Sequence, residues 1–163
     1  MSKIVQEVIA ANDKYVASFT KGSLPLPPDR KFAIVTCMDA RIDPAKALGL
    51  KEGDAHVIRN AGGRAKEALR SVIISQQLLG TTEVIVIHHT DCGMLTFTDN
   101  QLHGILKDKF NTDVSVDFLP FSDLESSVKE DVDLIKNSGV VDKSVNATGW
   151  VYEVETGKIR SVV

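Results

Sequence analysis

The first part of the chain combines a helical apolar pattern with a proline-rich segment. Apolar residues recur at helical spacing at Ile4, Val5, Val8, Ile9, Val16 and Phe19. They predict an amphipathic helix over residues 3–19. Residues 22–28 follow and contain three prolines, which exclude a helix or a central strand. This segment is expected to run extended along a surface, so that the helix either covers the core or reaches a partner subunit.

Three short apolar stretches, at 32–37, 55–58 and 83–89, have the composition of buried strands. Helical segments separate them. Asp43 and Pro44 form a helix start that Gly49 ends, and an apolar stripe over 65–79 predicts a second helix that Gly80 closes. Because strands and helices alternate, the connections should be right-handed crossovers and the sheet mainly parallel.

The last part of the chain predicts two more helices and a hairpin. Thr98 can cap a helix that runs to Phe110, residues 111–121 are irregular, and Ser122 with Glu125 forms a capping box for a helix to Lys136. Residues 148–154 and 159–163 alternate in polarity around a turn at 156–157. The fold class is therefore α/β, a mainly parallel sheet with flanking helices and an antiparallel C-terminal edge.

Composition narrows the class of protein. The 163 residues suit a single domain over 1–163, with 43% apolar and 25% charged residues. A net charge of −3 without a basic block, together with 6% aromatic residues, argues against nucleic-acid binding. No apolar run reaches the length of a membrane span, and no signal pattern begins the chain, so a cytoplasmic location is expected.

Metal-binding residue types stand at the ends of two predicted strands. Cys37 closes the first strand, while His89 and Cys92 follow the third. Ligands of open parallel sheets collect beyond the carboxyl ends of the strands, and neighbouring strands lie about 4.8 Å apart. Two cysteines and one histidine form a zinc set that leaves a fourth tetrahedral position free, which is typical of a catalytic site.

Other roles for these residues are open at this point. A buried cysteine can serve as a small apolar residue, and a Cys–His nucleophile pair would leave the second thiol without a role. His88 should point to the opposite face and act as a hydrogen-bonded supporting group. His56 is expected to be a core or interface residue, and His103 to be solvated on an exposed helix face.

Asp39 and Arg41 follow Cys37 at alternate positions, so all three can share one side of the strand end. Asp39 can accept a hydrogen bond from a metal-bound hydroxide and orient it. Arg41 can clamp Asp39 and keep it off the metal. If the clamp slips, Asp39 can become the fourth ligand. A purely structural salt bridge is the competing interpretation.

Two motifs resemble those of the β-class carbonic anhydrases. Residues 37–41 are similar to the Cys-x-Asp-x-Arg motif of that family, residues 89–93 to its His-x-x-Cys-Gly motif, and residues 53–62 to the segment between them. The resemblance covers about residues 24–154. It implies one Zn²⁺ per subunit held by Cys37, His89 and Cys92, with Asp39 and Arg41 as the catalytic dyad. It also implies a homodimer or dimer of dimers, with the N-terminal helix lying on the partner.

The sequence departs from many members of that family in two places. Residues 24–28 lack the glutamine that often precedes the first motif, and Trp150 lies too far downstream for an allosteric Trp-Arg-Tyr bicarbonate site. The chain looks most like a compact branch that also contains carbonyl sulfide hydrolases. The larger sulfur end of carbonyl sulfide would need an apolar wall, for which the candidates are Leu24, Met94, Leu95 and Phe97. Helical or interface packing is the competing and more common role for such residues.

The expected activity is reversible hydration of CO₂ to bicarbonate and a proton by zinc-bound hydroxide. The alternative is hydrolysis of carbonyl sulfide to CO₂ and H₂S at the same site. A remoter alternative is a non-catalytic zinc-stabilised domain in which Asp39 is a permanent fourth ligand. A nucleotide-binding role has no support, because no Gly-x-Gly-x-x-Gly follows a strand.

Overall fold

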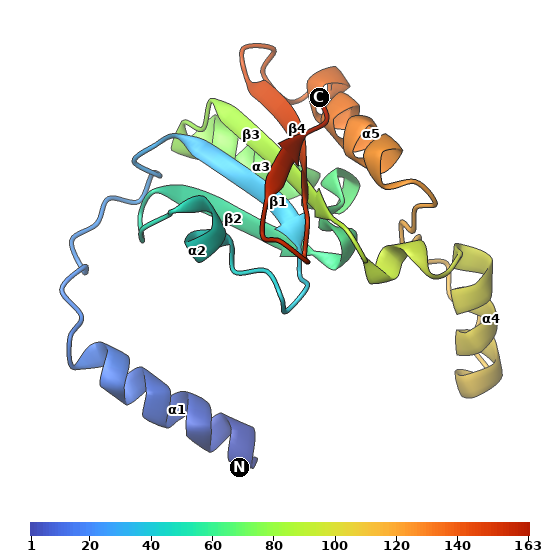
Figure 1. Ribbon diagram of the computed structural model, residues 1–163, viewed down its shortest axis with the longest axis horizontal. Helices are drawn as coiled ribbons and strands as arrows, with labels where there is room; N and C mark the ends of the chain where they lie inside the picture. Colours follow the sequence, from blue (N-terminus) through green and yellow to red (C-terminus); the bar gives the residue numbers. More distant parts are fainter.

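The computed structural model describes residues 1–163 and is organised around a five-stranded sheet in the order β2-β1-β3-β4-β5 (Figure 1). The strands are β1 (Phe32–Cys37), β2 (Ala55–Asn60), β3 (Glu83–His89), β4 (Asn146–Tyr152) and β5 (Ile159–Ser161). The pairs β1–β2, β1–β3 and β3–β4 are parallel, and β4–β5 is antiparallel. The predicted α/β fold with an antiparallel C-terminal edge is confirmed.

Both faces of the central strands are covered, which explains their nearly continuous apolar sequences. On one face, α3 (Ala65–Leu79) and α5 (Leu124–Asn137) pack over Val35, Val84 and Val86. On the other face, the short helix α2 (Pro44–Leu48) lies over Ile34 and Ile87. Each fully buried side chain of this size contributes about 1.5–3 kcal/mol. This core fixes the ends of β1 and β3, which carry Cys37 and His89.

The predicted ends of α2, α3 and α4 (Asp99–Phe110) agree with the structure, whereas α1 (Lys3–Val16) ends three residues before the predicted end, and α5 begins one residue late. Asp43 accepts the backbone N–H of Lys46 at the start of α2, and Gly49 and Gly80 end α2 and α3 in the left-handed conformation. Thr98 caps α4 (Asp99–Phe110) with a capping box, as expected.

The predicted capping box at α5 is wrong. Asp123 caps this helix by accepting the backbone N–H of Ser126 at 2.7 Å, so the helix begins one residue later than Ser122 and Glu125 suggested. Ser122 and Asp123 both have a suitable acceptor. Val128 and Val132 of this helix are fully buried.

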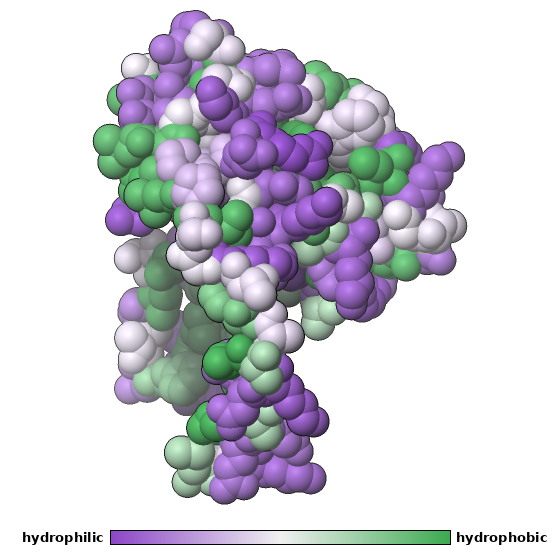
Figure 2. Space-filling model, turned by 90° about the vertical axis from the view of Figure 1, so that its left-hand side faces the viewer, coloured by the Kyte–Doolittle hydropathy of each residue, from purple (hydrophilic) through white to green (hydrophobic).

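Helix α1 (Lys3–Val16) stands away from the body at the end of an extended segment, and none of its residues is buried (Figure 1). Lys21 and Tyr15 both contact Glu52, which ties the arm to the body. Hydrophobic residues lie along one side of the projecting helix and hydrophilic ones along the other (Figure 2). No helix of the protein is both long and apolar enough to cross a bilayer.

The two histidines outside the motif on β3 have structural partners. His103 lies on a helix with no buried residue, as predicted, but it is partly covered rather than fully solvated, because residues 111–119 fold back along α4. His103 donates to the carbonyl oxygen of Val116 at 2.7 Å and lies against Phe118. His56 is partly buried on β2 and hydrogen-bonds Ser75 of α3 at 2.6 Å, in keeping with the expected core or interface role.

Candidate metal centre

The end of β1 is held in place by a glycine turn that follows β2. The backbone N–H of Met38 donates to the carbonyl oxygen of Asn60 at 2.8 Å. Gly63 packs so closely that a Cβ there would lie 2.8 Å from the carbonyl carbon of Thr36 and 2.9 Å from the nitrogen of Cys37. Its φ of 71° is also in the left-handed region. Only glycine fits here, and the turn fixes the backbone that carries Cys37.

The loop after β3 places the second pair of candidate ligands. His89 ends the strand, and Cys92 follows after Thr90 and Asp91, whose φ of 52° reverses the chain. The backbone N–H of Thr90 donates to a carbonyl oxygen of β4 at 3.0 Å, and its hydroxyl accepts from the N–H of Val154 at 3.0 Å. The C-terminal hairpin therefore holds this loop against the sheet.

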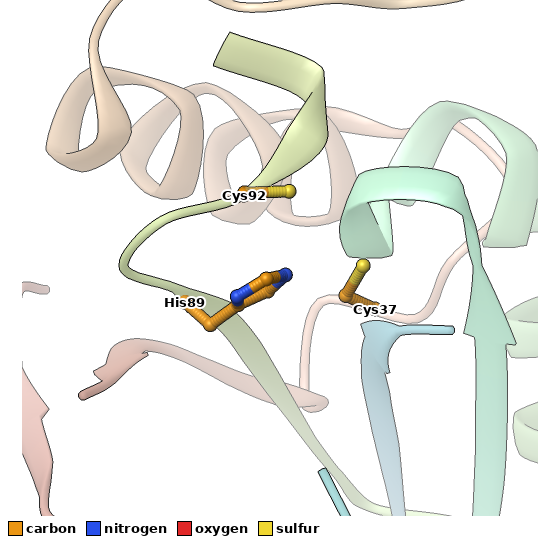
Figure 3. A group of neighbouring side chains, drawn as sticks. All are labelled: Cys37, His89 and Cys92. Carbon is orange, nitrogen blue, oxygen red and sulfur yellow. The ribbon is translucent and has the colours of Figure 1, made fainter. Parts of the chain in front are cut away.

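Cys37, His89 and Cys92 converge from these two strand ends (Figure 3). Their ligand atoms all lie within 4.8 Å of one another, and all three residues are buried. His89 donates from Nδ1 to the carbonyl oxygen of Thr90 at 2.8 Å, so its Nε2 carries the free lone pair. That buried Nε2 has no hydrogen-bond partner. An orphaned imidazole nitrogen beside two thiols fits a zinc ion in both donor type and position.

The two thiols are electrostatically unequal. Their mutual hydrogen bond lowers the pKa of Cys37 to about 4 and raises the pKa of Cys92 above its usual value. Burial lowers the pKa of His89, but the adjacent Cys37 thiolate outweighs burial and raises it. The hydrogen bond between the two thiols therefore favours the thiolate at Cys37 and the protonated thiol at Cys92. A metal ion must displace the proton of Cys92 and leave His89 neutral.

Asp39 and Arg41 form the ion pair that the sequence suggested. Arg41 donates from Nε to Asp39 Oδ1 at 3.0 Å and from Nη2 to Oδ2 at 2.8 Å, and its backbone N–H donates to Oδ1 at 2.8 Å. These bonds hold the pKa of Asp39 well below its usual range. Asp39 Oδ2 lies 3.8 Å from His89 Nε2, so the carboxylate borders the candidate ligand set.

A cavity of about 390 Å³ opens over the three candidate ligands. Of the predicted wall residues, Met94 and Phe97 line it. Leu95 lines a neighbouring hollow instead, and Leu24 packs by Gly53, outside both. The cavity is bounded by Cys37, Met38, Asp39, Ala61, Gly62, His89, Cys92, Gly93, Met94, Thr96 and Phe97.

His88 faces away from the cavity, as predicted, and is fully buried. It hydrogen-bonds Ser127 at 2.8 Å and Asp131 at 3.0 Å, and Asp131 also pairs with Arg64 at 3.4 Å. The sequence analysis missed both α5 residues. The available signal was a serine and an aspartate four positions apart on the apolar face of that helix.

Asp91 is a second residue that the sequence analysis left without a role. Its carboxylate accepts from Arg41 Nη1 at 2.7 Å, and its carbonyl oxygen accepts from Nη2 at 3.0 Å. The signal was a carboxylate beside Cys92, within the motif itself. Arg41 is therefore held between two acidic residues, and its pKa is raised by the hydrogen bonds to both.

A family model, a solved structure and a curated relative that resemble this chain are all carbonic anhydrases. A family model described as carbonic anhydrase matches residues 32–159. The solved structure of a carbonic anhydrase from Glaciozyma antarctica is 56% identical, with a TM-score of 0.94 over 100% of each chain. β-Carbonic anhydrase 1 of Mycobacterium tuberculosis is 43% identical over 162 residues, covering 98% of each chain.

A relative with a different named activity is also similar. A carbon disulfide hydrolase of Saccharolobus solfataricus is 35% identical over 185 aligned positions, covering 98% of this chain and 89% of the relative.

Proposed function

The chain belongs to the β-carbonic anhydrase family, and from that membership and its site geometry we propose that it catalyses the reversible hydration of CO₂ to bicarbonate and a proton. Cys37, His89 and Cys92 would hold one zinc ion. The observation that carries this proposal is the buried, unpartnered Nε2 of His89 among two thiols, with all ligand atoms within 4.8 Å. Such a set leaves a position free for chemistry.

Zinc bound there supplies a Lewis acid that lowers the pKa of water and so provides a nucleophile near neutral pH. Asp39 orients the attacking oxygen by accepting its hydrogen bond. The low pKa of Asp39 keeps it ionised, so it can only accept. Arg41 donates hydrogen bonds from Nε and Nη2 to the Asp39 carboxylate and so fixes its orientation. As the new C–O bond forms, the product proton leaves to buffer.

The cavity suits a small linear substrate. Ala61, Gly62, Met94 and Phe97 give it apolar walls beside the reacting centre. Gly62 keeps one wall recessed, because a Cβ there would lie 2.9 Å from Met94 and 3.3 Å from Phe121. Apolar walls exclude bulk water and accept an uncharged cumulene such as CO₂.

A second candidate is hydrolysis of a sulfur-containing cumulene, carbonyl sulfide or carbon disulfide. The similarity to a carbon disulfide hydrolase favours this candidate. The electrophile is again a linear central carbon, so the same nucleophile and the same ligand residues would serve. The larger sulfur end would rest against Met94 and Phe97.

We also propose that the protein is a homodimer, or a dimer of dimers, in which α1 packs on the partner. The apolar side chains of α1 have nothing to cover in their own chain. A second copy would bury Ile4, Val8 and Ile9, and Val8→Asp should lower the mass measured by light scattering. The two free thiols also fit a reducing compartment such as the cytoplasm.

Parallel stopped-flow assays of zinc-loaded protein test the activity, with CO₂ hydration measured beside sulfide release from carbonyl sulfide and carbon disulfide. Cys37→Ser and His89→Asn should lose zinc and every activity. His103→Asn is the matched histidine control and should retain both. Zinc and full activity in Cys37→Ser would refute the ligand set. An inactive wild type that holds zinc but binds no small anion would instead support the non-catalytic alternative.

A further inference from the structure

Arg41 bonds to two carboxylates, and only one belongs to the Asp39 pair. We propose that Asp91 is a positioning residue that holds Arg41 in place and thereby keeps the Asp39 carboxylate off the metal. This inference rests on the proposed zinc site. It concerns a residue that does not itself reach the reacting atoms.

The guanidinium of Arg41 is hydrogen-bonded to Asp91 as well as to Asp39. Nε and one bond of Nη2 go to Asp39. Nη1 bonds Asp91 Oδ2 at 2.7 Å, and Nη2 also bonds the Asp91 carbonyl oxygen at 3.0 Å. Every nitrogen of the guanidinium therefore has an acceptor, and half of that acceptor set comes from Asp91. A planar guanidinium that is hydrogen-bonded by two residues on different sides is held in one orientation. A guanidinium bonded by only one residue can rotate away.

The bonds to Asp91 are important because the Arg41 side chain is exposed to solvent. The Arg41 side chain is 48% exposed, so packing alone does not hold it. The Asp39 carboxylate is only 16% exposed and lies 3.8 Å from His89 Nε2. If Arg41 swings into solvent, Asp39 loses its main partner at a place from which it can turn onto the metal. The Asp39 carboxylate would then take the fourth coordination position of the metal, and no external ligand could bind there.

The backbone of Asp91 supports the same assignment. Its φ of 52° lies in the left-handed region, which aspartate and asparagine tolerate better than most residues. That turn places the carboxylate against Arg41 while the next residue, Cys92, enters the ligand cluster. An isolated exposed ion pair would contribute little. Here, however, the pair joins the loop after β3 to the dyad after β1.

Cobalt-loaded protein allows the position of Asp39 to be followed without any turnover. Azide binding, titrated by the visible absorption of Co²⁺, reports the fraction of sites with a free position. Asp91→Asn removes the charge and tolerates the left-handed backbone, and Asp91→Gly removes the side chain and the strain. Glu125→Gln is the matched control, because Glu125 pairs with Arg160 at the same 2.7 Å. The hydrogen bonds of Arg41 go to Asp39 and Asp91 alone, so this control leaves them in place.

We expect both Asp91 variants to bind azide about threefold to tenfold more weakly at unchanged cobalt content, and Glu125→Gln to match wild type. In an Asp39→Asn background the Asp91 substitutions should have no further effect, because the group they release is no longer a carboxylate. Unchanged azide affinity in Asp91→Asn would overturn the proposal. So would loss of cobalt, or an equal effect in the Asp39→Asn background, since Asp91 would then act on Cys92 directly. Failure of CO₂ hydration in zinc-loaded wild type would count against the proposed function and leave this titration interpretable.

Discussion

Replacing Gly63 with alanine should destabilise the protein and disturb the metal centre together. Two costs add at this position. The left-handed backbone costs an L-residue about 1–2 kcal/mol, and the φ of Gly63 is 71°. The added methyl group would also lie 2.8 Å from the carbonyl carbon of Thr36 and 2.9 Å from the nitrogen of Cys37. Both neighbours are backbone atoms of a central strand and cannot rotate away, so overpacking adds about 1–3 kcal/mol.

Gly80 provides a control with the same backbone and no clash. Its φ is also 71°, and a Cβ there would meet nothing within 4 Å. Gly80→Ala should therefore show only the conformational cost. In urea unfolding, Gly63→Ala should lose about 1–3 kcal/mol more than Gly80→Ala. A zinc titration against a chromophoric chelator should show weaker binding only in Gly63→Ala, because Cys37 is displaced. Equal unfolding free energies and equal zinc affinities in the two variants would refute this account of the turn.

Three further predictions follow from the geometry. Asp39→Asn should keep its zinc but lower kcat for CO₂ hydration by about 100-fold, which stopped-flow measurement checks; an unchanged rate would make the ion pair structural. Asp131→Ala should lower the free energy of unfolding by about 3–5 kcal/mol by leaving its buried partners uncompensated, whereas Asp133→Ala, exposed on the same helix, should change little; equal effects would contradict the buried network. Zinc affinity should rise about tenfold per pH unit or more between pH 6 and 8, because the hydrogen bond to Cys37 raises the pKa of Cys92 and zinc must displace the proton of that thiol. A flat profile in competition titrations would contradict that assignment.

Local signals in the sequence were sufficient for most of the fold. The Asp43–Pro44 start, the terminal glycines of α2 and α3 and the period of the apolar residues depend on interactions within a few residues. The start of α5 was misplaced by one residue because Ser122 and Asp123 are both capable caps. Residue type alone does not distinguish the two, and the structure shows that Asp123 is the residue that accepts the hydrogen bond.

The candidate site was predictable where its residues follow strands. Cys37, His89 and Cys92 could be brought together from the sequence because parallel strands end at a common edge. The role of Asp131 could not, because it depends on how α5 crosses the sheet and meets His88. The partner of His103 was missed for a similar reason, since nothing local indicates that residues 111–119 return along α4.

X-ray absorption at the zinc K-edge of the zinc-loaded protein tests the ligand set most directly. The proposed ligand set requires one zinc per chain with two sulfur neighbours at about 2.3 Å and one nitrogen at about 2.0 Å. Cys92→Ser should remove one sulfur neighbour or the metal itself. A spectrum without sulfur, or one that Cys92→Ser leaves unchanged, would contradict the metal centre on which the proposed function depends.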